Sequence, residues 1–404
     1  MGLATVPTPT DRCIADAHRD YPATAELTYM DVAARGLMSQ QVRAALDAHL
    51  DTLASGEINK DDFFALVERT RARFAAMIRA QSDEIAFTKN VSEGLNMVAT
   101  GLPWEAGDNV IVCPELEHPN NVYCWLNLRQ HGVEVRTVAP CQGHLPVADM
   151  IERMDARTRT VTASTVTFAP GFRTDIERLG QACRERGIFF LVDAAQSCGV
   201  LQTDVEASHI DGLAVSTQKG LLGLYGMGFL YCRREWAERI QPAYLARFGV
   251  DLGDAHEASM GSEAYKLMPA ARRFDVGNYN FVGCVAADAS MGQLLTYDPK
   301  AVEHYVVGLA HELAQGFMDL GLPVCGGAPG AHLAGIVTVG ELGSSHYGTD
   351  DARFNQLYTS LHDHAVRLSI RRGVLRFSLH LYNTEDDVNR VLELAQQGLG
   401  SSRR

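Results

Sequence analysis

Regularly spaced apolar residues predict two helices near the start of the chain. Segments 39–53 and 61–78 place apolar side chains at the three- and four-residue intervals of an amphipathic helix. Further along, short apolar runs alternate with segments of helical spacing. The runs predict strands at 108–115, 133–139, 160–168, 188–196, 211–218 and 228–232.

The clearest helix between these strands covers 174–187, where Thr174 can cap the first turn and Gly187 can end the last. Strands that alternate with helices predict an α/β fold with a mostly parallel sheet covered on both faces.

After about residue 270 the alternation of strands and helices weakens. The segments 298–321, 335–341 and 374–382 then predict a smaller α+β lobe, and 251–266 is expected to be a surface loop.

Composition narrows the class of protein. The 404 residues allow two domains, and 46% hydrophobic with 21% charged residues is typical of a soluble globular protein. A net charge of −13 argues against nucleic-acid and anionic-membrane partners. The apolar runs are too short for a transmembrane helix, and residues 1–12 resemble a disordered lead-in rather than a signal peptide. Nine cysteines without paired spacing predict free thiols in a reducing cytoplasm.

A lysine interrupts the apolar stretch 212–232, and lysines are rarely buried unless paired. Lys219 closes one predicted strand, Asp193 closes the strand before it, and Gln196 follows Asp193. Ligands of open α/β sheets bind at these carboxyl ends. Pyridoxal 5'-phosphate (PLP) needs such a lysine for a Schiff base and an aspartate for its pyridine nitrogen. Alone, Lys219 could reach solvent from a strand edge and Asp193 could cap a helix; together they favour the cofactor.

Two further features suit the same cofactor. In 86–102 a strand end is followed by Asn90, Val91 and Ser92, which open a helix. Free amides, the helix dipole and the Ser92 hydroxyl suit a phosphate, although a plain N-cap is the commoner explanation when this feature is taken alone. His118 follows another strand and could stack on a planar ring, although most such histidines are ordinary loop residues.

With these residues placed, the chain resembles the class V aminotransferases, which are fold type I PLP enzymes. The family includes proteins similar to cysteine desulfurases, isopenicillin N epimerases and cysteine-S-conjugate C–S lyases. The resemblance covers roughly residues 28–395 and rests on motifs in family order: TKNVSEGLN, EHPNN, GFRTDIERLGQACRERGIFFLVDAAQSCG, STQKGLLGLYGMGFLYC, RRFDVGN and VLRFSLHLYNTEDDV. It implies a PLP-binding large domain at 31–272, a small α+β domain at 273–404, and an arm at 1–30 that joins the small domain.

The resemblance also implies roles for individual residues. Lys219 would carry the cofactor and move the substrate's Cα proton, and Asp193 would pair with the pyridine nitrogen. Gln196 would bind the ring hydroxyl, and His118 would stack on the ring. The phosphate would be held by the Val91 amide, Ser92, Ser216 and Gln218, together with Asn278 from the second subunit of a homodimer. Arg376 would bind the α-carboxylate of the substrate. Thr165 stands where many relatives have an asparagine that contacts the substrate.

Departures from the family pattern bear on the reaction. Gln218 stands where related desulfurases have histidine, and 364–378 contains no cysteine; the nearest earlier one is Cys325. A persulfide-forming desulfurase is therefore not expected. The favoured reaction is C–S β-elimination (a lyase) on an S-substituted cysteine, with secondary metabolism as the expected context. Transamination comes second, and loss of the α-carboxylate, alone or with oxidation, third.

Other protein classes fit less well. A nucleotide-dependent enzyme would need a G-x-G-x-x-G or G-x-x-x-x-G-K-[ST] motif, and neither stands in place. An inactive scaffold would be expected to lose Lys219 or Asp193. The histidines in 361–372 lack companion ligands, so no metal site is expected. Arg371 and Arg372 suggest a solvated turn, or alternatively a contact with an acidic substrate near Arg376.

Overall fold

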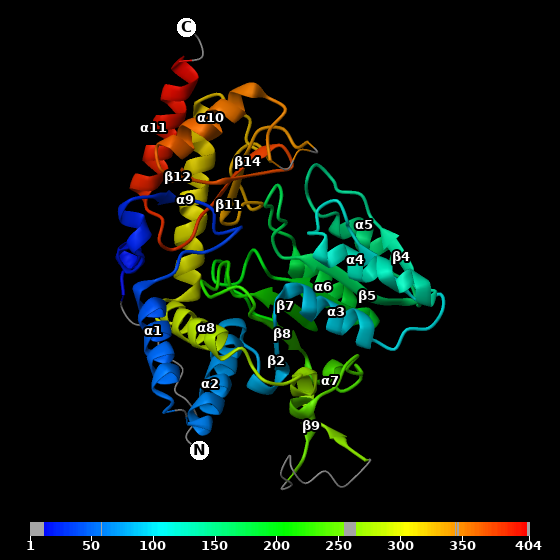
Figure 1. Ribbon diagram of the computed structural model, residues 1–404. Helices are drawn as coiled ribbons and strands as arrows, with labels where there is room; N and C mark the ends of the chain where they lie inside the picture. Colours follow the sequence, from blue (N-terminus) through cyan, green and yellow to red (C-terminus); the bar gives the residue numbers. More distant parts are fainter. Residues whose placement is uncertain (1–11, 58, 254–263, 344, 346, 402–404) are drawn as a thin grey trace.

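The computed structural model describes residues 12–57, 59–253, 264–343, 345 and 347–401. One part is built around a seven-stranded sheet, and another packs long helices beside a small antiparallel sheet (Figure 1). Of the predicted lead-in 1–12, only the last residue is described. Residues 254–263 of the predicted loop 251–266 also lie outside the described residues. The two ends of that loop are paired instead, because β9 (Val250–Asp251) runs antiparallel to β10 (Lys266–Leu267).

The large sheet has the order β2-β8-β7-β6-β5-β3-β4. Pairings from β4 through β7 are parallel, whereas β8 runs antiparallel to both β7 and β2. The mostly parallel sheet predicted from the sequence is therefore confirmed. Its strands are β2 (Ile85–Thr88), β3 (Asn109–Val112), β4 (Glu134–Thr137), β5 (Thr158–Ser164), β6 (Phe189–Asp193), β7 (Gly212–Ser216) and β8 (Gly228–Cys232).

Helices cover both faces of this sheet. In β6, Phe190 packs into a core shared with α2 (Lys60–Ile78), α5 (Val147–Glu152) and α6 (Ile176–Arg186). Its neighbour Phe189 points to the opposite core, shared with α3 (Val91–Gly101) and α4 (Asn120–Asn127). Side chains alternate across a strand, so a run that is buried on both faces must be apolar throughout. This explains the uninterrupted apolar runs of the sequence.

The start of α6 differs by one residue from the prediction. Its N-cap is Asp175, whose side chain accepts a hydrogen bond from the Arg178 N–H, and not Thr174. The Thr174 N–H donates instead to the Thr165 carbonyl, which keeps Thr174 in the extended segment before the helix. Gly187 ends the helix as predicted, in the left-handed conformation that glycine adopts readily.

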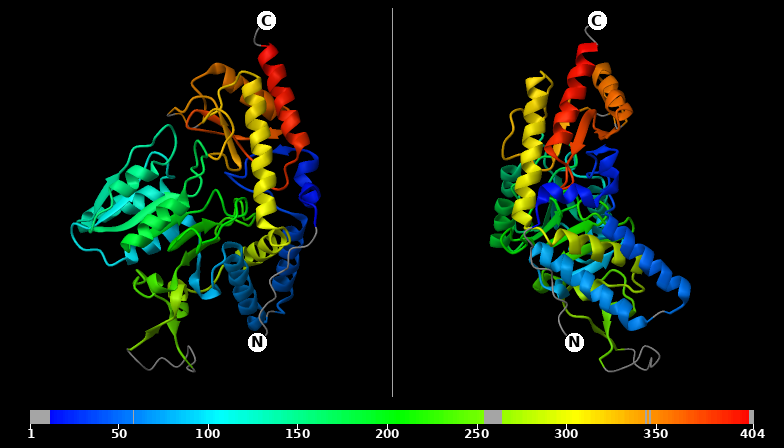
Figure 2. Two further views of the ribbon diagram at one scale, coloured as in Figure 1. Left: turned by 180° about the vertical axis from the view of Figure 1, so that it is seen from behind. Right: turned by 90° about the vertical axis from the view of Figure 1, so that its left-hand side faces the viewer.

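The C-terminal part contains a three-stranded antiparallel sheet of order β11-β14-β13. The first described residues belong to this part, because β1 (Thr28–Tyr29) pairs in parallel with β12 (Val366–Arg367). Figure 2 shows this N-terminal segment, residues 12–36, beside α9. The other elements are β11 (Ile336–Val339), β13 (Ser369–Arg371), β14 (Val374–Ser378), α9 (Pro299–Asp319), α10 (Ala352–Asp363) and α11 (Glu385–Ser401).

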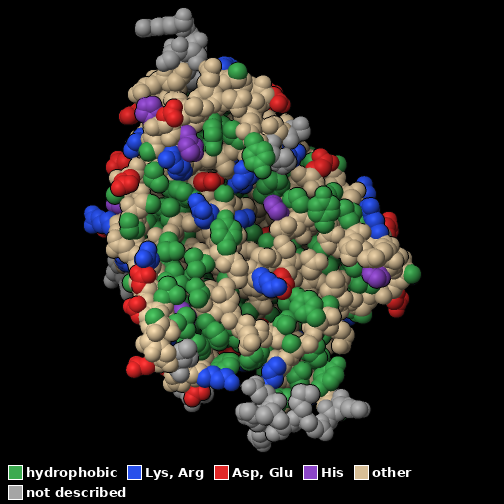
Figure 3. All heavy atoms as spheres, in the orientation of Figure 1, with side chains coloured by type: hydrophobic (Ala, Val, Ile, Leu, Met, Phe, Trp, Pro, Cys, Tyr) green, Lys and Arg blue, Asp and Glu red, His purple; other side chains and the backbone are tan. Residues whose placement is uncertain are grey.

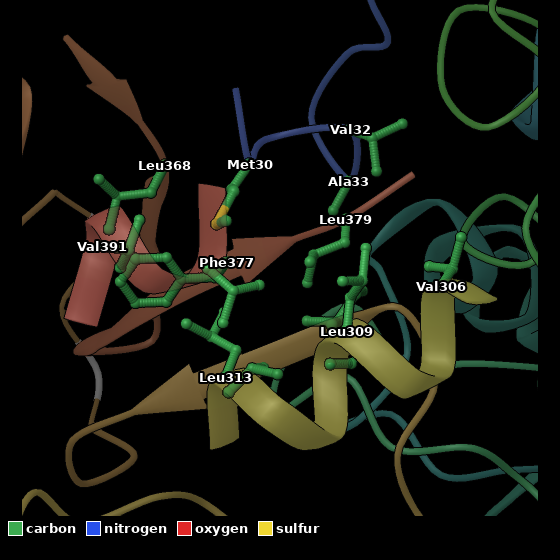
Figure 4. Packing of buried hydrophobic residues seen from close by; sticks show 14 of the residues in the cluster. Met30, Val32, Ala33, Val306, Leu309, Leu313, Leu368, Phe377, Leu379 and Val391 are labelled. Carbon is green, nitrogen blue, oxygen red and sulfur yellow. The ribbon is translucent and has the colours of Figure 1, made fainter. Parts of the chain in front are cut away.

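A continuous apolar core joins these segments (Figure 4). Phe377 of β14 is fully buried among side chains that include Leu313 of α9, Val391 of α11 and Met30 of the N-terminal segment. Burial of one such side chain stabilises the fold by about 1.5–3 kcal/mol. The N-terminal segment is thus held firmly against the C-terminal part of the chain.

The remaining elements complete the frame. α8 (Phe281–Leu294) packs against α1 (Gln40–Ser55) and α2, and α7 (Arg234–Ala237) follows β8. Across the described ranges, no helix combines the length and apolar character needed to cross a bilayer. Short 3₁₀ helices lie at Ile14–Asp20, Pro22–Ala25, Ser82–Glu84, Leu128–His131, Arg247–Gly249 and Ala270–Phe274.

Candidate active site

A cavity of about 290 Å³ lies at the carboxyl ends of the central strands. Ser164, Asp193 and Ser216, the last residues of β5, β6 and β7, all line it. This is the position where open α/β sheets bind ligands. Most of the residues predicted from the sequence line it as well: Val91, Ser92, His118, Asp193, Gln196, Ser216, Gln218 and Lys219.

Asp193 places a carboxylate at the floor of the cavity, and its side chain is almost completely buried. One oxygen, Oδ1, accepts a hydrogen bond from the Ala195 N–H at 2.9 Å. Burial raises the pKa of Asp193, while that N–H and Lys219 act in the opposite direction. A cation or a protonated ring nitrogen in the cavity would compensate this desolvated charge.

Lys219 follows β7 and brings the only side-chain amine among the described residues that line the cavity. Burial lowers its pKa to about 8; Asp193 opposes this change, and Arg376 and Arg371 add to it. At pH 7 about a tenth of such amines are neutral, compared with far fewer for an ordinary lysine. Lys219 is therefore suited to act as a nucleophile and a proton acceptor.

The loop that carries Lys219 is held from three directions. The Gly36 N–H of the N-terminal segment donates to the Gln218 carbonyl at 2.8 Å. His380 Nε2 lies 2.9 Å from the Gly220 carbonyl oxygen. On the third side, a Cβ on Gly199 would lie 2.0 Å from that same oxygen, so only glycine permits this approach. The amine therefore projects from a rigid, crowded loop.

The start of α3 closes another side of the cavity. The Asn90 side chain caps the helix by accepting from the Glu93 N–H at 3.0 Å. The Val91 N–H donates to Ser216 Oγ at 2.7 Å, which ties the helix to the end of β7. Ser92 and Gln218 line the cavity here. Hydroxyl and amide donors beside the positive end of a helix dipole suit a phosphate group.

Two predicted side chains lie nearer the cavity mouth. His118 is exposed, and its Nδ1 accepts from the Asn120 N–H at 3.2 Å, so the neutral ring carries its proton on Nε2. Partial desolvation and the nearby Lys219 lower the pKa of His118. Gln196 donates from its side-chain amide to the Ala33 carbonyl at 3.2 Å, which links it to the N-terminal segment.

Sequence reasoning missed Glu117, which is buried beside the cavity. Its Oε1 accepts from the Ser164 N–H at 2.7 Å, and its Oε2 accepts from the Ser164 hydroxyl and from Asn121 Nδ2. Burial, and to a smaller extent the charge of Asp193, raise the pKa of Glu117 to about 7, against the hydrogen bonds from Ser164 and Asn121. Glu117 precedes His118 in the motif EHPNN, but an acidic residue after a strand gives no local sign of burial.

Three predicted residues do not line the cavity. Arg376 is almost fully buried behind it; its Nη1 donates to the Phe168 carbonyl at 3.0 Å and its Nε to Ser369 Oγ at 3.1 Å. Thr165 faces a different cavity and donates to Ser197 Oγ at 2.6 Å. Asn278 is exposed in the loop before α8.

No cysteine is among the described residues that line the cavity. Cys124 and Cys198, whose pKa values burial raises to about 12, are buried. Cys325 lies in the C-terminal part, where its Sγ contacts the Gly340 carbonyl at 3.4 Å, and burial raises its pKa as well. These thiols are protonated near neutral pH and are poor nucleophiles.

The side chains of this cavity fit PLP. A buried carboxylate lies on its floor, a lysine with a lowered pKa projects into it, and hydroxyl donors surround the start of a helix. The fold and cavity define a fold type I PLP enzyme.

More specifically, the chain belongs to the class-V aminotransferase family, whose family model matches residues 28–391. A probable cysteine desulfurase of Methanothermobacter thermautotrophicus is 28% identical over 401 residues, covering 95% of this chain and 98% of that protein. An uncharacterised aminotransferase of Bacillus subtilis is 26% identical over 373 residues, covering 92% of this chain and 95% of that protein.

Solved structures agree with this family. The apo cysteine desulfurase of Thermococcus onnurineus NA1 superposes with a TM-score of 0.83 at 26% identity, covering 98% of this chain and all of that one. The cystine C–S lyase C-DES, in complex with its reaction product cysteine persulfide, has a TM-score of 0.81 at 21% identity, covering 93% of this chain and 99% of that one. At that identity the second likeness shows the fold.

Proposed function

We propose that this PLP enzyme catalyses β-elimination at the C–S bond of an S-substituted cysteine. The observation that carries the proposal is a cavity with Lys219 and Asp193 but, among its described lining residues, no thiol. Relatives named cysteine desulfurases act, by that name, on the sulfur of cysteine. A persulfide-forming desulfurase needs a protein thiol at the substrate, whereas elimination needs only a base and room for the leaving group.

In the proposed reaction, PLP supplies the electron sink that stabilises negative charge at the substrate Cα. The neutral Lys219 amine removes the Cα proton. The Cβ–S bond then breaks, the electron pair leaves with sulfur, and the thiolate takes up a proton. Hydrolysis of the three-carbon fragment gives pyruvate and ammonium, so one conjugate and one water yield a thiol, pyruvate and ammonium.

The other roles are proposed for residues of the same cavity. Asp193 would hold the pyridine nitrogen, Gln196 the ring hydroxyl, and His118 would cover the ring. Ser92, Ser216, Gln218 and the Val91 amide would hold the phosphate. These assignments are supported by the shared cavity and by the helix start beside it. Arg376, whose Nη1 donates to the Phe168 carbonyl beside the cavity, would recognise the α-carboxylate, and Thr165 would contact the substrate.

The test supplies PLP-loaded protein with S-substituted cysteines and no keto acid, and follows pyruvate and ammonium. Sustained turnover, lost in Lys219→Ala and kept in the exposed control Lys266→Ala, supports elimination. A single turnover that resumes only when keto acid is added would establish a transaminase instead. Borohydride reduction followed by peptide mass spectrometry identifies the lysine that carries the cofactor; a label elsewhere than Lys219 overturns the site.

We further propose a homodimer in which Asn278 completes the partner's phosphate site. Asn278 is exposed and outside its own cavity. Mixed dimers of Lys219→Ala and Asn278→Ala test this arrangement. If Asn278 acts across the interface, each mixed dimer holds one site with both natural residues, and mixing restores activity. If Asn278 acts within its own chain, no mixed site is intact and mixing restores nothing.

A further inference from the structure

A second cavity, of about 330 Å³, adjoins the candidate active site. Its walls come from the N-terminal segment, α10 and the strands β12 and β13. Three arginines line it, namely Arg35, Arg367 and Arg371, and Asp31 is the sole carboxylate among its described lining residues. Blue Lys and Arg side chains gather around a red acidic one in the upper middle of the face in Figure 3, where these segments meet.

No carboxylate of the described residues forms a close ion pair with these three arginines, although the charges of Arg371 and Arg35 lower the pKa of Asp31 against the larger effect of its burial. Arg367 Nη1 donates to the His362 carbonyl at 2.9 Å, and Arg371 Nη1 donates to the Ile370 carbonyl at 2.7 Å. Both partners are backbone oxygens, which satisfy a donor but leave the positive charge in place. Asp31 lies 3.9 Å from Arg376 Nη2, so its charge is already shared with a fourth arginine.

Arg376 forms the wall between the two cavities. Its Nη1 contacts the carbonyl of Phe168, which lines the first cavity, and its Nε contacts Ser369, which lines the second. The positive charge of Arg371 reaches across this wall, because it lowers the pKa values of both Lys219 and Arg376. A group that extends from a substrate at Lys219 therefore meets a positive field beyond Arg376.

One interpretation of the sequence placed Arg371 and Arg372 in a solvated turn; Arg372 does lie in the turn between β13 and β14, whereas Arg371 is the last residue of β13. Both are half-buried, and the Arg372 Nη1 donates to the Glu115 carbonyl at 2.7 Å, which links the β13–β14 turn to the loop before His118. The backbone is thereby fixed where Arg371 faces the second cavity. Half-buried arginines that keep their charge and lack a carboxylate partner are typical of anion-recognition sites.

We propose that the cavity around Arg35 and Arg371 binds a second anionic group, a carboxylate, at the far end of the substrate. If the elimination proposed above is correct, the substrate is then a cysteine whose sulfur substituent carries a carboxylate. Neutral S-alkyl cysteines lack the group that these arginines recognise. The binding site itself does not depend on which bond is broken.

Binding is tested first, with PLP-loaded protein and two unreactive probes of nearly equal shape. Glutarate carries two carboxylates, whereas its monoamide glutaramate carries one. Calorimetry should show glutarate binding at least about tenfold more tightly, with the preference weakening as salt is raised. Arg371→Gln and Arg35→Gln should abolish the preference, and Arg43→Gln, an exposed arginine paired with Asp47 on α1, should keep it. Equal binding of the two probes overturns the proposal.

Turnover then separates this proposal from the proposed reaction. S-(2-carboxyethyl)-L-cysteine and its neutral amide differ only in the distal charge. A kcat/KM ratio of at least about ten in favour of the acid, reduced toward one in Arg371→Gln, supports the site. Elimination of both substrates at equal kcat/KM keeps the reaction but overturns the site. A glutarate preference without elimination of either substrate keeps the site and overturns the reaction.

Discussion

His380 should govern how the region around Lys219 responds to acid. Its ring is fully buried; Nδ1 accepts from the Leu381 N–H at 2.8 Å, so the neutral ring carries its proton on Nε2, which donates to the Gly220 carbonyl. Burial lowers the pKa of His380 from 6.5 to about 4. A proton added to Nδ1 would have to displace the Leu381 N–H inside an apolar core.

The magnitude follows from the two pKa values. Between about pH 6.5 and 4 the unfolded chain binds a proton at this residue and the folded chain does not, so stability falls as the pH falls. At about 1.4 kcal/mol per pH unit, His380 alone accounts for a loss of about 3 kcal/mol. His380→Gln keeps a donor for Gly220 but cannot ionise, and it gives up the acceptor for Leu381. We expect it to be about 1 kcal/mol less stable than the natural chain at neutral pH.

The assay compares melting temperatures of the two proteins across this pH range, both loaded with PLP. The quantity compared is the difference in melting temperature between the natural protein and His380→Gln. Groups that titrate in both proteins contribute equally and cancel, so the pH dependence of this difference reports the titration of His380. The natural protein should be the more stable one at neutral pH, and the order should reverse as the pH approaches 4. A difference that stays constant across the range would refute the assigned protonation state. His380→Ala, which leaves the Gly220 carbonyl unpaired, should also reduce kcat at neutral pH.

Three further perturbations address other parts of the site. Gly199→Ala should destabilise the protein by about 3 kcal/mol or more and lower its activity, because the new Cβ would press on the Gly220 carbonyl. Gly56→Ala is the matched control in thermal melts, because Gly56 also has a positive φ but has open space around it. Glu117→Gln should destabilise the protein by about 1–3 kcal/mol, because an amide NH2 would replace one carboxylate oxygen and face the donors of Ser164 or Asn121. Denaturant titration measures this loss, and unchanged stability would contradict the hydrogen-bond network around Glu117. Asp193→Asn should weaken PLP retention, followed by absorbance during dialysis, and undiminished retention would count against its proposed pairing with the ring.

The strands of the sheet could be predicted because their signal is local. A strand such as β6 is buried on both faces, so its first four residues must be apolar before the polar strand end, Asp193, is reached. The same logic places Asp193 and Lys219 at one edge of the sheet. The antiparallel direction of β8 could not be deduced, because direction depends on which strands it lies between and not on its own composition.

Other features of the site depend on contacts between distant segments. Glu117 is buried because Ser164 and Asn121 surround it, and no local pattern records that. Arg371 resembles any arginine near a turn until the N-terminal segment brings Arg35 to the same cavity. The cap of α6 shifted from Thr174 to Asp175 because a backbone hydrogen bond to Thr165 holds the earlier residue extended.

The pairing of β1 with β12 sets an order of events during synthesis on the ribosome. Thr28 leaves the exit tunnel long before its partner Val366, which follows it far along the chain. Until that partner emerges, the segment that includes Gly36 lacks its strand partner, and the contact from Gly36 to the Lys219 loop is unsupported. Contacts between segments so distant in the sequence also form slowly, because they close a long loop. The binding site around Lys219 is therefore finished only after Val366 has been made, so loading with PLP is a late step in the folding of the chain.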